Sequence, residues 1–157
     1  METVSGDLIV KPNQRFALVV AEFNRFITER LADAAADCLL RHGAKDTQIS
    51  QVLVPGAFEI PVVARELAKS GKYAAVLCIG CVIRGETDHY DHVAGQVANG
   101  VGAVSVETGV PTIFGVITAD TVEQAINRAG LKHGNAGWNA AMAAIAAANV
   151  LTKIRGA

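Results

Sequence analysis

The segment RGETDHYDH (residues 84–92) brings together side chains that bind ions and carry protons. It follows directly on an almost uninterrupted apolar run, AAVLCIGCVI (residues 74–83), which is typical of a buried strand. The chain therefore leaves a strand and at once presents a glycine, a threonine, acids and histidines. Three interpretations are open: a metal site, an anion-binding turn with an acid/base group, or a solvated turn without chemistry.

The first half of this segment has the composition of an anion-binding turn. Gly85 frees the backbone to turn, Thr87 offers a hydroxyl group, and the amides around it begin a helix. The free N–H groups and the dipole at a helix start favour phosphate or carboxylate. A simple N-cap role for Thr87 or Asp88 is the alternative, since both residue types are common helix caps.

The two histidines raise the question of metal binding against proton transfer. His89 and His92 are three residues apart and share a helix face, with Asp88 and Asp91 beside them. The sequence has no H-E-x-x-H spacing and no further compact cluster of cysteines and histidines to complete a zinc site. An acid/base role for His89 beside an anion site fits better, because imidazole titrates near neutral pH. We therefore expect no metal, and we expect His92 to be a solvated or hydrogen-bonded helix residue.

Strand-like and helix-like segments alternate along the chain. Each expected strand is followed by a helix, and one more helix begins at residue 138; the expected strands are 15–20, 47–56, 73–83 and 111–118. This order predicts an α/β fold with a four-stranded parallel sheet, helices on both faces, and one domain over residues 1–157. Residues 1–14 are an expected arm, in which DLIV (7–10) adds an edge strand to the sheet of a neighbouring chain.

The composition limits the classes of protein to which the chain can belong. A length of 157 residues suits one domain, and a hydrophobic fraction of 51% exceeds what one core needs, which favours contacts between subunits. The net charge of −1 gives no basic surface for nucleic acid, and we find neither a membrane-spanning run nor a signal peptide. Three cysteines favour a reducing compartment, so we expect a cytoplasmic protein.

Cys78 and Cys81 have the C-x-x-C spacing of redox pairs. A redox pair needs a helix start to lower the pKa of one thiol, whereas both cysteines lie within an expected strand. Positions three apart on a strand point to opposite faces. The spacing therefore predicts two buried, unreactive thiols.

In a parallel sheet, ligands bind beyond the carboxyl ends of the strands. The loops expected at that edge carry FN (23–24), GAFE (56–59), RGETDH (84–89) and TAD (118–120). Two of these loops hold a phenylalanine, although aromatic residues make up only 5% of the chain. Phe23 and Phe58 at a polar rim favour stacking on a flat ring, and packing of each beneath its own loop is the alternative.

Five motifs, in register and at matching spacing, make the chain similar to a known family. FN after the first strand, VPGAFEIP, VIRGETDHYDHVAG, PTIFGVIT and EQAINRAGLKHGNAG follow one another in this order. Together they closely resemble lumazine synthase, the riboflavin-pathway family that makes 6,7-dimethyl-8-ribityllumazine. The resemblance extends from about Arg15 to Leu151.

This resemblance implies a three-layer, flavodoxin-like subunit that assembles as a pentamer, in many members within an icosahedral shell, with active sites between neighbouring chains. It implies a transferase that condenses 5-amino-6-(D-ribitylamino)uracil with 3,4-dihydroxy-2-butanone 4-phosphate and releases phosphate and water. It implies that neither a metal nor an organic cofactor takes part.

The resemblance also implies roles for residues at matching positions. His89 is the expected general acid/base, and Phe23 is expected to stack on the pyrimidine ring. Phe114 and Arg128 are expected to come from the neighbouring chain, where Phe114 completes an aromatic sandwich and Arg128 pairs with phosphate. The other expected substrate-binding residues hold the ribityl chain (Asn24, Ala57, Phe58, Glu59), bond the uracil edge through their backbone (Cys81, Val82, Ile83), border the phosphate (Glu86, Thr87) or lie near the rim (Lys132).

The chain departs from this family pattern at a few positions. Ala136 stands where many relatives have a lysine near the ribityl chain, and Asn127 and Asn139 stand where relatives tend to have acids. The last helix, NAAMAAIAAANVL (139–151), is rich in alanine, so we expect it to bury more than one face, in contacts between subunits. Two other functions stay open: a lumazine- or flavin-binding shell protein without efficient turnover, and a generic flavodoxin-like mononucleotide binder.

Overall fold

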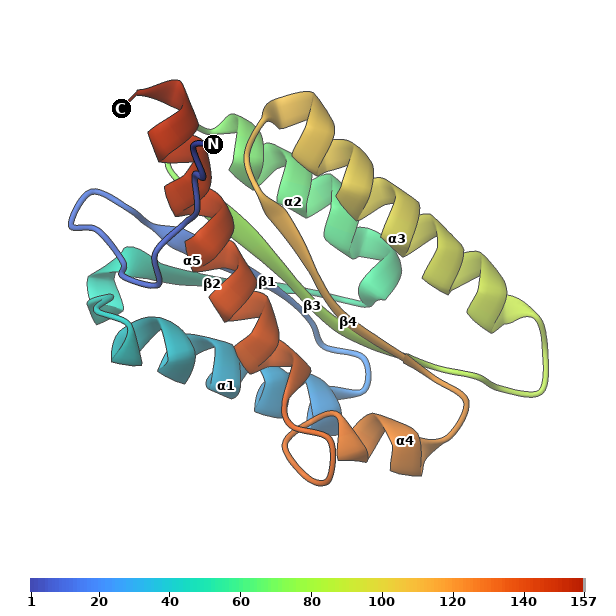
Figure 1. Cartoon of the computed structure of the whole chain (residues 1–157). Coiled ribbons are helices and arrows are strands. Elements are labelled where there is room, and N and C mark those ends of the chain that lie inside the picture. The colour runs from blue at the N-terminus through green and yellow to red at the C-terminus, as the bar shows by residue number, and fades with distance from the viewer. Residues whose placement is uncertain (157) are drawn as a thin grey trace.

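The computed structural model describes residues 1–156, and a four-stranded parallel sheet forms its centre (Figure 1). The strands are β1 (Phe16–Ala21), β2 (Ile49–Val54), β3 (Ala75–Ile83) and β4 (Thr112–Ala119), in the order β2-β1-β3-β4. All three strand pairs are parallel, which confirms the predicted fold. Every residue of β1 is buried, as expected for an apolar strand with both faces covered.

Helices cover both faces of this sheet (Figure 1). α1 (Arg25–Arg41) and α5 (Ala136–Arg155) pack on one face, α2 (Ile60–Lys69) and α3 (His89–Thr108) pack on the other, and α4 (Val122–Asn127) is a short helix after β4. Because side chains alternate along a strand, neighbouring residues contribute to different cores. Cys78 packs in the core under α2 and α3 and Cys81 in the core under α1 and α5, so the predicted opposite orientation of the two thiols is confirmed.

The order of the strands creates a crevice between β1 and β3. From β1 the chain adds β2 on one side and then returns to add β3 on the other. The two crossovers therefore diverge at the carboxyl ends of β1 and β3, which is where open α/β sheets bind ligands. The loops that carry Phe23, Ala57 and Thr87 all leave the sheet at this edge.

α3 continues without interruption through Gly95, Gly100 and Gly102, although glycine disfavours the helical conformation. Gly100 has a packing reason, since a Cβ atom there would lie 2.7 Å from the Cβ of Pro61. Pro61 lies in the first turn of α2, where proline is favoured because its missing N–H would have no helical partner. Close packing at this point holds the start of α2, which directly follows the loop at 56–59.

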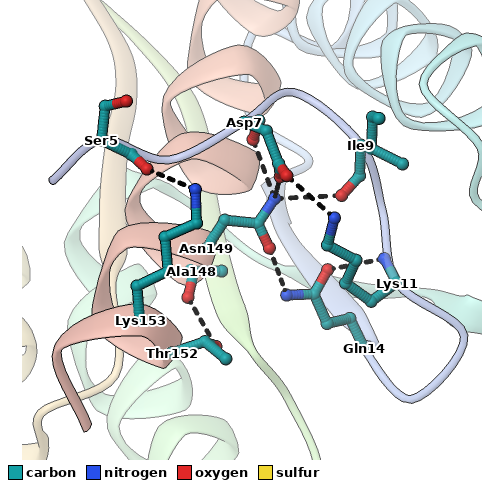
Figure 2. Close-up of polar contacts among 9 residues, drawn as sticks. All are labelled: Ser5, Asp7, Ile9, Lys11, Gln14, Ala148, Asn149, Thr152 and Lys153. Carbon is teal, nitrogen blue, oxygen red and sulfur yellow. Dashed lines mark hydrogen bonds and ion pairs between the residues drawn. The ribbon is translucent and has the colours of Figure 1, made fainter. Parts of the chain in front are cut away.

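Residues 1–14 form no strand, so the predicted edge strand at 7–10 is absent from the chain taken alone. These residues lie along α5 instead, where the buried Asn149 donates from Nδ2 to the carbonyl oxygens of Asp7 and Ile9 (Figure 2). Gln14 donates to the Oδ1 atom of Asn149 at 2.8 Å. Pairing of the arm with a neighbouring chain stays a prediction. It would require the bonds between the arm and Asn149 to break and bonds with the neighbouring chain to form.

The alanine-rich α5 buries several faces within its own chain. It contacts α1, the sheet and the arm, and a Cβ atom on Gly137 would lie 1.9 Å from the carbonyl oxygen of Leu31. A Cβ atom on Gly6 of the arm would approach the carbonyl oxygen of Ala146 equally closely. Small side chains are therefore needed for packing inside this chain, whereas the alanine-rich sequence predicted that they serve contacts between subunits. Across residues 1–156, no helix combines the length and the apolar character that crossing a membrane requires.

Candidate functional site

A cavity of about 820 Å³ lies at the carboxyl ends of β1, β2 and β3. Its size is within the range of cavities that hold small organic ligands. Four segments line it: the turn after β1, the loop after β2, the end of β3 with its following loop, and the first turns of α3. The sequence predicted this edge of the sheet because ligands bind beyond the carboxyl ends of parallel strands, and most of the residues it named lie here.

The turn after β1 contributes Phe23 and Asn24. The backbone N–H of Phe23 donates to the carbonyl of Pro55 at 3.0 Å, which fixes the turn against the β2 loop, while the ring stays 72% exposed. Asn24 has a φ of 59°, in the left-handed region that asparagine tolerates better than most residues. Its side chain does not cap α1; the Nδ2 atom donates to the carbonyl of Cys81 at 2.8 Å. This bond links the turn after β1 to the end of β3.

The loop after β2 contributes residues 55–59. Ala57–Glu59 form one turn of 3₁₀ helix, in which Ala57 is buried and the side chains of Phe58 and Glu59 project outward. The Phe58 side chain is 55% exposed, so the alternative that it packs beneath its own loop is wrong. Two exposed phenyl rings, Phe23 and Phe58, therefore lie at the mouth of one cavity.

The end of β3 and the start of α3 form the remaining wall. Cys81, Val82, Ile83 and Thr87 line it as predicted, and His89 follows as the first residue of α3. The Thr87 hydroxyl oxygen lies 3.4 Å from the His89 N–H, whereas the Asp88 side chain makes no capping bond. The amides at this helix start are therefore only weakly occupied by side chains, which leaves them available to an anion.

Sequence reasoning did not assign four further lining residues: Pro55, Tyr90, His92 and Val93. Helical spacing could have found two of them, because His92 and Val93 lie three and four residues after His89 and share its face. His92 lies on the cavity wall, with its Nε2 atom 3.9 Å from Asp88 and its side chain 80% exposed. Tyr90 is the next residue after His89, and neighbouring residues of a helix do not share a face, so helical spacing could not have predicted it.

Four predicted residues do not line this cavity. Glu86 is exposed in the loop before α3, beside residues that do. Phe114 lies on the edge strand β4, where it pairs with Cys78 and is 43% exposed. Arg128 follows the last residue of α4, Lys132 lies in the next loop, and both are exposed. The structure thus separates Phe114, Arg128 and Lys132 from the cavity of their own chain.

The comparison with known protein families decides the family of this chain. The family model described as 6,7-dimethyl-8-ribityllumazine synthase matches residues 13–152. The chain belongs to this family. The lumazine synthase resemblance of the five motifs is therefore confirmed, together with the flavodoxin-like fold.

Membership of the lumazine synthase family gives the chain its activity. It is a transferase of riboflavin biosynthesis that acts on small-molecule substrates. Nothing supports the alternatives of a non-catalytic shell protein or a generic mononucleotide binder. The cavity at the carboxyl edge is accordingly the candidate active site of a lumazine synthase subunit.

The charges of the site fit a phosphorylated substrate only in part. Within residues 1–156, the side chains that line the cavity include Glu59 and two histidines but neither lysine nor arginine. No group of three or more His, Cys, Asp or Glu residues in that part of the chain lies close enough together to hold a metal ion. Burial raises the pKa of the Cys81 thiol to about 11, so it stays protonated at neutral pH. A phosphate dianion would need a cation from elsewhere.

Proposed function

We propose that this cavity is half of an active site that a neighbouring chain completes. The main support is that the family-matched residues divide into two groups. Those around His89 line one cavity, whereas Phe114, Arg128 and Lys132 are exposed outside it. A second copy of the chain is the simplest source of the arginine that the cavity lacks.

The pyrimidine substrate, 5-amino-6-(D-ribitylamino)uracil, occupies the side of the cavity nearest β1 and β2 in this proposal. Phe23 stacks on its ring, and Phe114 of the neighbouring copy covers the opposite face. Asn24 and residues 57–59 hold the ribityl chain, with the Glu59 carboxylate accepting from its hydroxyl groups. The backbone of residues 81–83 bonds the uracil edge, so the side chain at Cys81 matters little.

The butanone phosphate binds at the start of α3. The amides around Thr87 and the neighbour's Arg128 hold the phosphate, with Glu86 and Lys132 at the rim. The 5-amino group of the pyrimidine attacks the ketone, and loss of water gives an imine. Phosphate then leaves, and the ribitylamino nitrogen closes the second ring with loss of a second water.

His89 moves protons during these steps, because it begins α3 on the cavity wall. Arg128 and the amides near Thr87 stabilise the departing dianion. Much of the acceleration comes from holding two reactive substrates side by side, since their functional groups react without further activation.

The same proposal includes the assembly and its setting. One domain over residues 1–157, with residues 1–14 as an arm, forms a pentamer or a shell of pentamers without nucleic acid or membrane. The exposed apolar side chains Phe26, Val62 and Val106 favour such contacts. Three buried free cysteines favour the cytoplasm.

The direct test is to mix the two substrates with the purified protein and follow the absorbance and fluorescence of the lumazine. We expect lumazine and phosphate in equal amounts, with no added metal or cofactor. Retention of activity after chelator treatment is expected as well. Tight binding of the pyrimidine without product would contradict the catalytic proposal and favour a binding protein.

A further inference from the structure

The turn that carries His89 has few attachments to the rest of the fold. Residues 85–89 are exposed, and a Cβ atom at Gly85 would meet nothing within 4 Å. Tyr90 and Val93 pack against the core under α2 and α3, but they lie beyond this turn. Among residues 1–156, the one side-chain ion pair that residues 85–92 make outside their own segment joins Asp91 to Arg84. The Thr87–His89 and Asp88–His92 contacts are internal to the segment.

Arg84 contacts three partners at once. Its Nε atom donates to Oδ1 of Asp120 at 2.8 Å, and its Nη2 atom lies 3.5 Å from Oδ1 of Asp91. The guanidinium carbon lies 4.3 Å from the centre of the Tyr90 ring, a cation–π arrangement. Its backbone N–H donates to the carbonyl of Ala119 at 2.8 Å, so the base of the side chain is fixed by the sheet.

The Asp120 contact extends this connection to α4. The backbone N–H of Asp120 donates to Oε1 of Gln124 at 2.8 Å, and Gln124 N–H donates to the hydroxyl of Thr121 at 3.1 Å. These bonds begin α4, and Arg128 follows directly after its last residue. One guanidinium thus links the start of α3, which bears His89, to the short helix that presents Arg128.

We propose that Arg84 is a positioning residue for the reaction, which fixes the phosphate-binding turn at 85–89 relative to α4. It is not itself a cavity residue, and carboxylates on two sides already occupy its donors. Because Arg84 contacts both the start of α3 and Asp120 before α4, it aligns two features of one chain. These are the anion site of that chain and Arg128, which contributes to the site of the neighbouring chain. This inference rests on the proposed function of the site.

The contacts require arginine rather than any cation. A planar guanidinium can lie over Tyr90 and bond Asp120 and Asp91 along its edge, whereas an ammonium group has no plane to stack. Because the three ionic side chains are about half exposed, each ion pair contributes little by itself, and a moderate effect is expected.

The test compares the kinetics of Arg84→Lys and Arg84→Met with the unchanged protein. We expect KM for the butanone phosphate, and the inhibition constant for orthophosphate, to rise about 3- to 10-fold in both variants. KM for the pyrimidine should stay within about twofold, because that substrate binds at the β1 and β2 side. Arg65→Met is the matched control: Arg65 is similarly exposed and pairs with Glu107 at 3.9 Å, away from the cavity, so both KM values should be unchanged.

Equal changes in both KM values, or no change in either, would overturn the positioning role. If the Arg84 variants fail to assemble, the same kinetics are measured on Asp120→Asn and Asp91→Asn. An unchanged KM for the phosphate substrate in both variants would overturn the positioning role of Arg84. Absence of lumazine from the unchanged protein would instead count against the proposed function. Orthophosphate titration by calorimetry then decides the inference: weaker binding to Arg84→Met supports it, and equal binding overturns it.

Discussion

Asn24 illustrates how one residue joins two loops of the site. Its left-handed backbone turns the chain sharply after β1, and its amide then reaches the Cys81 carbonyl at the end of β3. An aspartate tolerates the same backbone but cannot donate this bond, and a leucine would be strained there. The residue type is therefore explained by the crevice it spans before any substrate contact is considered.

His89 is the residue whose change should separate proton transfer from binding. We expect His89→Ala to lower kcat by about 10- to 100-fold, because the acid/base contribution is lost while both substrates are still held together. His92→Ala should lower kcat less than about threefold, since its imidazole is mostly exposed and lies beside Asp88. Steady-state kinetics with both substrates give these values.

Two outcomes would contradict the assignment of His89. One is complete loss of activity with both substrates still bound, which would contradict the moderate contribution expected of His89 and the large one expected of proximity. The other is a larger effect of His92→Ala than of His89→Ala, which would exchange their roles. The circular dichroism of both variants should match that of the unchanged protein.

At the scale of elements, the packing of α2 on α3 offers a paired test within one helix. We expect Gly100→Ala to destabilise the fold by about 1–3 kcal/mol, because its methyl group would overlap Pro61. Gly102→Ala should stabilise it by about 0.5–1 kcal/mol, since nothing lies within 4 Å and alanine favours helix. Urea denaturation measures both changes, and equal stabilities would refute the close approach of the two helices.

The buried Asn149 amide makes most of the side-chain hydrogen bonds between the arm and α5, beside one from Lys153 to the carbonyl of Ser5. We expect Asn149→Ala to cost about 2–3 kcal/mol, because Gln14 and the carbonyls of Asp7 and Ile9 lose their partner. Hydrogen exchange of residues 5–14 should quicken at the same time. Asn139→Ala, at an exposed position of the same helix, should change stability by less than about 0.5 kcal/mol. If both variants behave alike, the arm does not rest on α5 in solution.

Elements were predictable where local pattern decides them, and less so where distant contacts do. Apolar runs identified all four strands. The short helix α4 begins at a cap, Thr121, with the T-x-x-Q spacing typical of a capping box. The Gln124 side chain nevertheless bonds the N–H of Asp120, one residue earlier than a capping box requires. The contacts of the arm with α5 were not predicted, because Asn149 is 142 residues away from Asp7 and is one polar residue among alanines.

In the candidate site, too, local sequence pattern predicted some residues, whereas those placed by tertiary contacts were missed. Most residues after β1, β2 and β3 were placed correctly, because parallel strands end at one edge of the sheet, but residues 118–120 after β4 do not line the cavity. Tyr90 and Arg84 were missed, since a ring beneath a guanidinium has no spacing that sequence periodicity reveals. The family resemblance supplied Phe114 and Arg128, which position along the chain alone would not have joined to this cavity.

At the scale of the whole molecule, the proposed division of the active site between chains predicts complementation. His89→Ala and Arg128→Ala are expected to be impaired separately, the second chiefly through a higher KM for the butanone phosphate. If the two variants are unfolded together and reassembled in equal amounts, about a quarter of the sites pair an intact His89 with a neighbour's intact Arg128. Activity should therefore rise above the mean of the two parents, toward about a quarter of the unchanged level per site. Reassembly of each variant alone is the control, and an activity equal to the mean of the parents would place both residues in the site of one chain.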